Sequence, residues 1–390
     1  MRRLTPEAVR FLAGPAARAE LAALAGEPLY PLAALAALRK RWGEGEAAWL
    51  YDQAVLRRRA RGKFPEADAL LFEAEALEQA SAWPVARWRA EQVFGPYERV
   101  ADLGAGIGGD ALALAAAGKR VLAVERDPVR AAILEHNVAA LGLAGRVEVV
   151  RGDLRGIALD VEAAFADPAR RREGRRSVRL QAMDPSFAEL AGLAGRVPAV
   201  AVKLAPALDK AELPPEAGLG FVSLDGELKE ALAGLGELAW AEPWAAVLPA
   251  GARLHGPEAD PLPTGEPLRY LYEPDPAVIR AGLVRRLGRE LEAAQLDPEV
   301  AYLTAEVLRS TPLARAWEVL EHGPFRQKTV AAWLAAHGAG GVEVKRRRSP
   351  VEPAVLEKKL RAALVSGGPV LTLFLTRIAG RPWAVLGRRP

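Results

Sequence analysis

The chain of 390 residues contains no cysteine, which excludes disulfide bonds, thiolate metal sites and cysteine nucleophiles. Its four histidines, His136, His255, His322 and His337, are not spaced as a metal-binding pair, so we expect no metal site. No stretch of about 18 apolar residues is free of charges and prolines, and the N-terminal apolar run is too short for a signal peptide. We therefore expect a cytoplasmic protein without a membrane-spanning helix.

Charge of one sign does not dominate, because 53 lysines and arginines face 49 acidic residues and the net charge is only +4. The basic residues nevertheless gather in runs, of which the clearest are Arg57–Arg59, Arg170–Arg172 and Lys345–Arg348. Each run is open to two interpretations, a phosphate-binding patch or a solvated face. The composition, 51% hydrophobic and 26% charged, is that of a folded protein, and the length suggests two or three domains.

Apolar periodicity divides the chain into three predicted domains. Residues 1–95 carry apolar side chains at three- and four-residue spacing, which predicts a helical region. Residues 96–265 alternate apolar strands with helices, as in ERVADLGAG, GDALALAAAG and RVLAVERD, which indicates a doubly wound α/β domain with a parallel sheet. Residues 266–390 predict an α+β domain, with helices over 274–296 and after Pro312 and a terminal hairpin.

A glycine-rich turn follows the first predicted strand of the α/β domain. It has the sequence D-L-G-A-G-I-G-G, from Asp102 to Gly109, and opens a helix. Glycine lets the backbone approach a ligand here, because a Cβ atom would block the approach. Glu125 ends the second predicted strand and is placed to accept hydrogen bonds from a ribose diol. Together these features indicate a cofactor that contains a nucleoside.

Three further carboxylates at predicted strand ends narrow the choice of cofactor. Asp102 is unfavourable beside the pyrophosphate of a dinucleotide but suits a cationic ligand, such as the amino group and sulfonium region of S-adenosylmethionine. Asp153 follows the third strand and can accept a hydrogen bond from an adenine amine. Asp167 follows the fourth strand, at the carboxyl edge where ligands bind in such sheets. We therefore expect S-adenosylmethionine as the cofactor.

The motifs D-L-G-x-G-x-G, V-E-x-D, G-D and D-P, at successive strand ends, resemble the class I S-adenosylmethionine-dependent methyltransferases over roughly residues 98–249. The resemblance implies a Rossmann-like methyltransferase sheet, with Asp102 at the methionine part of the cofactor and Glu125 at the ribose. It also implies that Asp167 and Pro168 face the transferred methyl group. The implied cofactor-binding residues are Asp102, Gly104, Ala105, Gly106, Glu125, Arg126, Asp153 and Leu154.

Phrases outside this core resemble a narrower family. FADPARR, VKLAPAL, FVSLDGELKEA, LYEPDPAVIRAGL and EVKRRRSP are similar to an uncharacterised bacterial methyltransferase family with a C-terminal THUMP-like domain, and the likeness covers most of the chain beyond about residue 62. The phrase IGGDALALA also looks like the cap-guanine N2-methyltransferase relatives, which act on RNA. THUMP domains accompany enzymes that modify tRNA and other RNA, so both likenesses imply an RNA partner.

The motif after the fourth predicted strand departs from the usual pattern. Methyltransferases that act on an exocyclic amine usually have Asp or Asn, two prolines and an aromatic residue, whereas this chain has D-P-A-R at 167–170. Asp167 can still orient a nitrogen nucleophile or act as a base. Stacking on the substrate base would then come from Phe64, Phe165 or Phe187, or be absent.

Basic residues predict how a nucleic-acid substrate would be held. The expected substrate contacts are Phe64, Arg170, Arg171, Lys203, Arg346 and Arg347. Arg170–Arg172 can equally order their own loop, and Lys203 can equally be a snorkelling lysine at a strand end. We expect methylation of a base nitrogen of RNA by direct transfer. A small-molecule or protein substrate, and a catalytically lost RNA-binding protein, remain alternatives.

Overall fold

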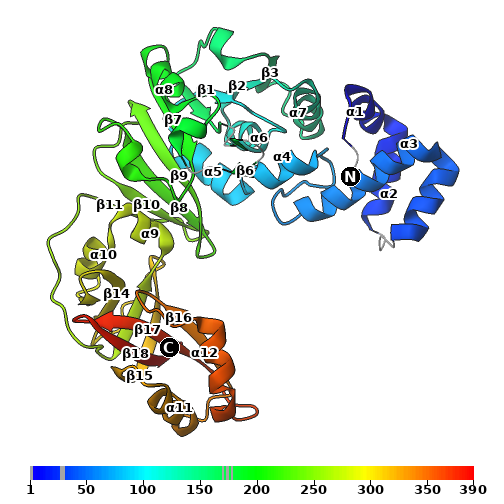
Figure 1. Ribbon diagram of the computed structural model, residues 1–390. Helices are drawn as coiled ribbons and strands as arrows, with labels where there is room; N and C mark the ends of the chain where they lie inside the picture. The colour runs from blue at the N-terminus through cyan, green and yellow to red at the C-terminus, as the bar shows by residue number, and fades with distance from the viewer. Residues whose placement is uncertain (1–2, 27–30, 169–170, 173–174, 177–178) are drawn as a thin grey trace. The chain divides into compact units, whose positions relative to one another are not determined.

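The computed structural model describes residues 3–26, 31–168, 171–172, 175–176 and 179–390 (Figure 1). The chain forms two compact units. The first comprises Met1–Gly218 with Glu230–Trp240, and the second comprises Leu219–Lys229 with Ala241–Pro390. The N-terminal helices thus share a unit with the first sheet, and the predicted boundaries near residues 95 and 265 stay predictions.

Among the described residues of the first unit before Arg99, all regular elements are helices, as their periodicity predicts. The helices of this unit are α1 (Pro6–Ala13), α2 (Pro15–Ala25), α3 (Pro31–Ala60), α4 (Ala74–Gln79), α5 (Trp83–Gln92), α6 (Gly109–Ala116), α7 (Pro128–Ala140) and α8 (Phe187–Ala191), with short 3₁₀ turns η1 (Leu154–Gly156), η2 (Leu180–Ala182), η3 (Gly192–Gly195) and η4 (Lys210–Glu212). Thr5 caps α1 by accepting a hydrogen bond from the Ala8 amide, and proline occupies the first turn of α1, α2 and α5. α1 packs on α7 and α5 packs on α6, so the N-terminal helices are part of the same core as the sheet.

The first sheet confirms the predicted doubly wound α/β fold. Its strands in this unit are β1 (Arg99–Leu103), β2 (Arg120–Glu125), β3 (Val147–Arg151), β4 (Ala163–Ala166), β7 (Ala199–Leu204) and β9 (Glu227–Gly236), and a short pair is formed by β5 (Arg171–Arg172) and β6 (Arg175–Arg176). The order is β9-β7-β4-β1-β2-β3, in which β9 is antiparallel to β7 and all other pairs are parallel. The chain leaves β1 through α6 and α7 and later returns to its other side at β4. That reversal creates a switch point between β1 and β4, where such sheets bind ligands.

The second unit contains three paired strands and a separate seven-stranded sheet. Its elements are β8 (Gly218–Leu224), β10 (Trp244–Leu248), β11 (Ala252–His255), β12 (Tyr270–Pro274), α9 (Pro276–Ala281), α10 (Val284–Glu290), β13 (Ala294–Asp297), β14 (Val300–Ala305), β15 (Ala314–Pro324), α11 (Gln327–Ala336), β16 (Gly341–Arg346), α12 (Pro353–Leu360), η5 (Arg361–Ala363), β17 (Val370–Ile378) and β18 (Arg381–Arg388). β10 pairs with β8 and β11, and the seven-stranded sheet has the order β13-β14-β12-β15-β18-β17-β16.

One helix prediction in this unit is wrong, and a second is confirmed only in part. The segment after Pro312 is not helical but forms β15, which pairs on one side with β12 and on the other with β18. The predicted helix over 274–296 is confirmed in α9 and α10, but its end forms β13. In both places strand pairing in the folded sheet outweighs local periodicity, which is a weak signal for short segments. The terminal hairpin is confirmed as β17 and β18. Among the described residues, no helix has the length and apolar character needed to cross a bilayer.

Candidate functional site

The glycine turn between β1 and α6 forms an open cradle. Gly104 and Gly106 have φ angles of 85° and 58°, a left-handed conformation that favours glycine. The amides of Gly104 and Ala105 donate to the Val124 carbonyl on β2, which fixes the turn to the sheet. A Cβ atom added at Gly104 or Gly106 would meet no atom closer than 3.7 Å, so the space above the turn is free for a ligand.

Glu125 is fixed against this turn at the end of β2. Its Oε2 accepts a hydrogen bond of 2.7 Å from the Gly106 amide, and its Oε1 accepts one of 2.7 Å from the Asp127 amide. The side chain is buried, yet each carboxylate oxygen retains a second lone pair. This arrangement suits the predicted contact with a ribose diol, which stays a prediction for this residue.

Asp102, near the end of β1, is the residue predicted to contact a cationic group of the cofactor. Its side chain is 2% exposed, and within the described part of the chain its Oδ2 has no hydrogen-bond partner. Burial, reinforced by the nearby carboxylate of Asp110, raises the pKa of Asp102 well above its ordinary value. A buried carboxyl group with a free oxygen fits an ammonium group, because the ammonium would supply both the missing hydrogen bond and the missing charge.

Asp167 lies directly after β4 and is held by Lys203 from the neighbouring strand β7. Lys203 Nζ donates to Asp167 Oδ2 at 2.7 Å and to Ser81 Oγ at 3.1 Å. The pairing of Val202 with Ala166 brings the two residues to the same level of the sheet. Burial alone would lower the pKa of Lys203, but the charge of Asp167, with other carboxylates, outweighs it and raises that pKa. Lys203 is therefore a charged, buried partner of Asp167 and not a snorkelling surface lysine.

Arg89 on α5 is the centre of the polar network behind Asp167. Its guanidinium pairs with Asp110 in the first turn of α6 and with Glu230 on β9, and it donates to Ser81 Oγ at 3.2 Å. It also lies over the Phe165 ring, 4.2 Å from the centroid. We call the set Ser81, Arg89, Asp110, Asp167, Lys203 and Glu230 the strand-end network.

Sequence reasoning did not identify Arg89, Ser81 or Glu230. The signal that Arg89 offered was a charged residue between Trp88 and Ala90 on a helix with other apolar residues, but its partner Glu230 lies 141 positions away. No local pattern links residues at that separation.

The predicted adenine side carries a second group of charges. Arg155 donates to Asp153 at 2.9 Å, to Asp184 at 3.0 Å and to Glu189 at 2.7 Å. Arg126 also contacts Asp184, at 3.0 Å. We call these five residues the Arg155 cluster. Asp153 therefore caps its own turn and pairs with Arg155, and Leu154 beside it is buried; their contact with adenine stays a prediction.

The predicted substrate residues do not all gather at Asp167. Phe64 is buried against Phe72 and lies beside Gly109. Phe165 and Phe187 are buried as well. Stacking on a substrate base would therefore require one of these rings to move. Arg170 lies outside the described residues, and of Arg171 only the backbone, in β5, is described. Pro168 is buried next to Asp167.

Arg346 and Arg347, in the second unit, both have carboxylate partners. Arg346 contacts Glu352 at 3.1 Å and Arg347 contacts Glu273 at 3.4 Å, which lowers the charge each offers to a phosphate. Their contact with substrate stays a prediction.

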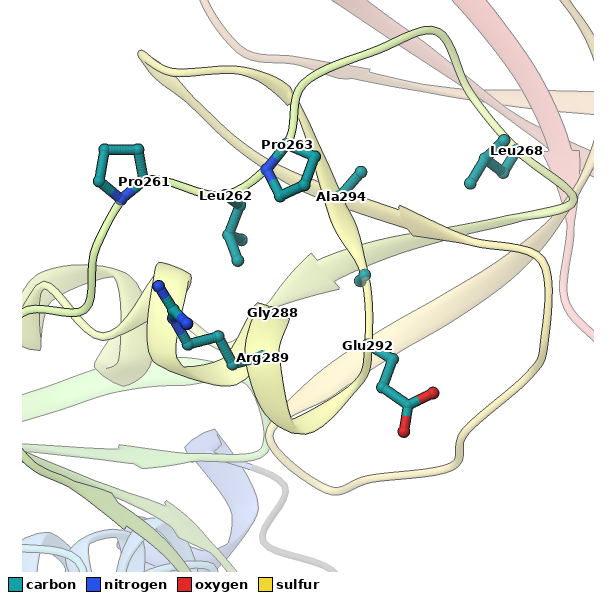
Figure 2. Close-up of a pocket in the computed structure, with 9 residues that line it drawn as sticks. Pro261, Leu262, Pro263, Leu268, Gly288, Arg289, Glu292 and Ala294 are labelled. Carbon is teal, nitrogen blue, oxygen red and sulfur yellow. The ribbon is translucent and has the colours of Figure 1, made fainter.

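A cavity of about 400 Å³ in the second unit holds none of the predicted site residues. Leu262, Pro263, Leu268, Gly288 and Arg289 are among its lining residues (Figure 2). In the described ranges no group of three or more His, Asp or Glu side chains is arranged to hold a metal ion. The residues that suit a cofactor therefore lie at the carboxyl edge of the first sheet.

Known proteins resemble the chain along most of its length. Residues 97–170 match the family model described as RNA cap guanine-N2 methyltransferase, and residues 314–389 match the model described as THUMP domain-like. Sequences from two Mycobacterium tuberculosis strains, CDC 1551 / Oshkosh and H37Rv, are 35% identical over 353 residues, which is 87% of this chain and 95% of theirs. Both are named uncharacterized S-adenosylmethionine-dependent methyltransferases. The crystal structure of a candidate methyltransferase from Porphyromonas gingivalis W83 has the same fold, with a TM-score of 0.76 and 22% identity over 98% of this chain and 97% of that one.

Proposed function

The chain belongs to the S-adenosylmethionine-dependent methyltransferases, and on that premise we propose that it methylates a base nitrogen of RNA by direct transfer. Its cofactor is S-adenosylmethionine, as the strand-end carboxylates predicted. One observation carries the proposal for nitrogen, namely Asp167, whose backbone carbonyl lies next to Gly104 of the glycine turn and whose carboxylate is held at one oxygen by Lys203.

The residues of the glycine turn would hold the cofactor. Asp102 would accept hydrogen bonds from the ammonium group, Glu125 from the ribose and Asp153 from the adenine amine. The bound cofactor supplies an electrophilic methyl group on its sulfonium. The protein's own contribution is then largely positioning, because direct displacement needs the nucleophile aligned with that methyl group.

Asp167 would orient the nucleophile. The Lys203 ammonium donates to Oδ2, and the other carboxylate oxygen can accept a hydrogen bond from an N–H group of the substrate. The nitrogen must lose a proton when it gains the methyl group, and Asp167 is placed to take it. The chain has no cysteine, so a route through a cysteine adduct on the substrate base has no nucleophile here.

The RNA part of the proposal is supported by the two family models. The segment matched by the cap guanine-N2 model ends at residue 170 and includes the glycine turn, Glu125 and Asp167. The THUMP domain-like match covers the C-terminal segment. A small-molecule substrate would leave that second domain without a role in catalysis.

The test is incubation of the protein with labelled S-adenosylmethionine and undermodified total RNA, followed by mass spectrometry of the nucleosides. We expect one methylated base, formed by the wild type and by Asp160→Ala, an exposed control, but not by Asp167→Ala. Calorimetry should show that Asp167→Ala still binds the cofactor. If cofactor binding is lost as well, Asp167 belongs to the cofactor site. If RNA remains unlabelled while the cofactor binds, RNA is not the substrate.

A further inference from the structure

The basic side chains of the second unit differ in whether carboxylates compensate them. Every member of the predicted run Lys345–Arg348 has an acidic partner within 4.0 Å, supplied by Glu273, Glu299 or Glu352. Charges that are already paired attract a polyanion weakly, because the partner carboxylate repels it. The run is therefore a poor anchor for a phosphate backbone.

A second group of cations in the same unit is uncompensated. All its members are exposed, and among the described residues no carboxylate lies within ion-pair distance of them. The group comprises Arg326, Lys328, Lys358, Lys359, Arg361 and Arg381. The acidic neighbours have other partners, since Glu357 accepts a hydrogen bond of 2.9 Å from the Val344 amide and Glu352 pairs with Arg346.

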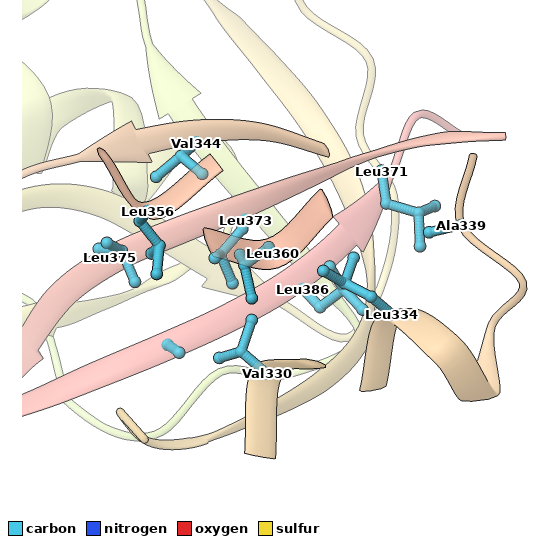
Figure 3. Packing of buried hydrophobic residues seen from close by; sticks show 11 residues of the cluster. Val330, Leu334, Ala339, Val344, Leu356, Leu360, Leu371, Leu373, Leu375 and Leu386 are labelled. Carbon is cyan, nitrogen blue, oxygen red and sulfur yellow. The ribbon is translucent and has the colours of Figure 1, made fainter. Parts of the chain in front are cut away.

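These cations lie on elements that are neighbours in space. α11 and α12 cover the same face of the seven-stranded sheet, where Val330 of α11 and Leu356 and Leu360 of α12 enter one apolar core (Figure 3). η5, which continues α12, contacts α11. Arg381, at the start of β18, is held near Arg326, because the Phe325 amide donates to the Pro382 carbonyl at 3.0 Å. We call this surface the α11–α12 face.

Exposed apolar side chains accompany the charges. Val355 on α12, Val365 after η5 and Val370 at the start of β17 are 51%, 46% and 71% exposed. Large exposed aliphatic side chains among uncompensated cations favour a macromolecular partner over a small anion, because such a partner would cover them.

We propose that the α11–α12 face binds the phosphate backbone of the RNA substrate. The inference rests on the proposed RNA activity and assigns the contact to this face instead of Lys345–Arg348. Six unpaired cations are complementary to a chain of phosphates, and each contact with a phosphate releases condensed counterions. Contacts with phosphates carry no sequence information, so the contribution of this face is the salt-dependent part of the affinity.

The test compares two variants that lose the same charge. K358Q/K359Q/R361Q removes three cations of the α11–α12 face, and R309Q/R377Q/R388Q removes three arginines that pair with Glu292, Glu299 and Glu318, of which Arg309 and Arg388 are exposed and Arg377 is half-buried. Binding of unmodified tRNA and rRNA transcripts is measured at several salt concentrations. We expect the first variant to bind at least about tenfold more weakly at 0.1 M salt, with a salt slope reduced by about 2, and the second to change less than about threefold.

Several outcomes would overturn the assignment. Equal losses in both variants would mean that only net charge matters. A loss of RNA affinity in R346Q/R347Q without a loss in K358Q/K359Q/R361Q would show that the run Lys345–Arg348, and not the α11–α12 face, contacts the RNA. Weaker binding to phosphatidylserine vesicles with unchanged RNA binding would make the face a membrane contact. If the wild type methylates RNA and K358Q/K359Q/R361Q binds it normally, the inference fails while the proposed function stands. Circular dichroism melts confirm that each variant is folded.

Discussion

Two clusters of charges in the first unit make a natural comparison, the strand-end network around Arg89 and the Arg155 cluster. Arg155 contacts three carboxylates and Arg89 contacts two. By number of ion pairs the Arg155 cluster is the larger. Burial reverses that ranking, because the Arg89 side chain is 2% exposed and that of Arg155 is 42% exposed.

Water accounts for the difference. At the Arg155 cluster it screens every charge and can replace any partner that is removed, so the ion pairs contribute little to stability. In the strand-end network Arg89 and Glu230 are both 2% exposed, so a removed cation leaves a buried carboxylate uncompensated. The buried network therefore makes the positions of Asp110, Asp167 and Lys203 depend on Arg89, and the exposed cluster makes no such demand.

The largest effect is expected for Arg89→Met. It leaves Asp110 and Glu230 without their cation, and breaking a buried pair from one side costs about 3–5 kcal/mol of unfolding free energy. Urea unfolding followed by circular dichroism measures the loss. The matched control is Arg87→Met on the same helix, whose exposed pair with Glu91 predicts a loss below about 1 kcal/mol. Equal losses in the two variants would show that burial does not set the value of these pairs.

The next effect concerns turnover. Lys203→Met keeps a side chain of similar length but removes the ammonium that holds Asp167, so we expect methyl transfer to fall about 10²-fold or more, as for loss of a positioned catalytic group. Cofactor affinity, measured by calorimetry, should change little. Lys203→Arg should recover part of the activity, because it restores the charge. A Lys203→Met enzyme with normal turnover would mean that Lys203 serves the fold and not the reaction.

A third prediction concerns Asp102, whose substitution should change both the stability of the protein and its affinity for the cofactor. The pKa of Asp102 is raised in the folded chain by burial first and by Asp110 second. The folded state thus binds this proton more tightly than the unfolded state, and stability falls as pH rises from the ordinary carboxyl range through the raised pKa. Asp102→Asn removes that loss, so we expect its unfolding free energy at pH 7 to equal or exceed that of the wild type.

The same substitution, Asp102→Asn, should also weaken binding of the cofactor. A hydrogen bond to a charged group contributes about 1.5–3 kcal/mol, so Asp102→Asn should bind S-adenosylmethionine about 10- to 100-fold more weakly. Calorimetry at pH 7 and urea titrations at pH 5 and 8 measure the two effects. Unchanged cofactor affinity would show that Asp102 does not contact the ammonium group of the cofactor. Unchanged pH dependence of stability would contradict the raised pKa of Asp102.

These clusters also mark how far sequence patterns reach. Asp102, Glu125, Asp153, Asp167 and Lys203 could be assigned to one edge because each ends or follows an apolar strand, and parallel strands bring their carboxyl ends together. The pattern did not reveal that Lys203 would pair with Asp167, since β4 and β7 become neighbours only in the folded sheet.

Hydrogen bonds between residues that are far apart in the sequence could not be predicted from the sequence patterns. Asn137, the single asparagine of the chain, is buried and bonds the backbone of Leu71 and the carbonyl of Ile107. It thereby ties the N-terminal segment to the glycine turn. In the second unit β15 was predicted as a helix, because its strand character depends on partners at both sides. Local periodicity carries no information on either kind of contact.

The smallest effect is expected in the Arg155 cluster. Arg155 and Ser186 lower the pKa of Glu189 to about 2, so in principle the pair adds stability above the ordinary pKa of a glutamate and loses it as pH falls towards 2. Glu189 and Arg155 are exposed, however, and salt screens them. Arg155→Met should therefore leave the midpoint of urea unfolding at pH 7 nearly unchanged, and 0.5 M salt should remove any remaining difference, whereas the loss in Arg89→Met should persist in salt. A salt-resistant loss in Arg155→Met would mean that three exposed carboxylates hold an arginine as firmly as two buried ones.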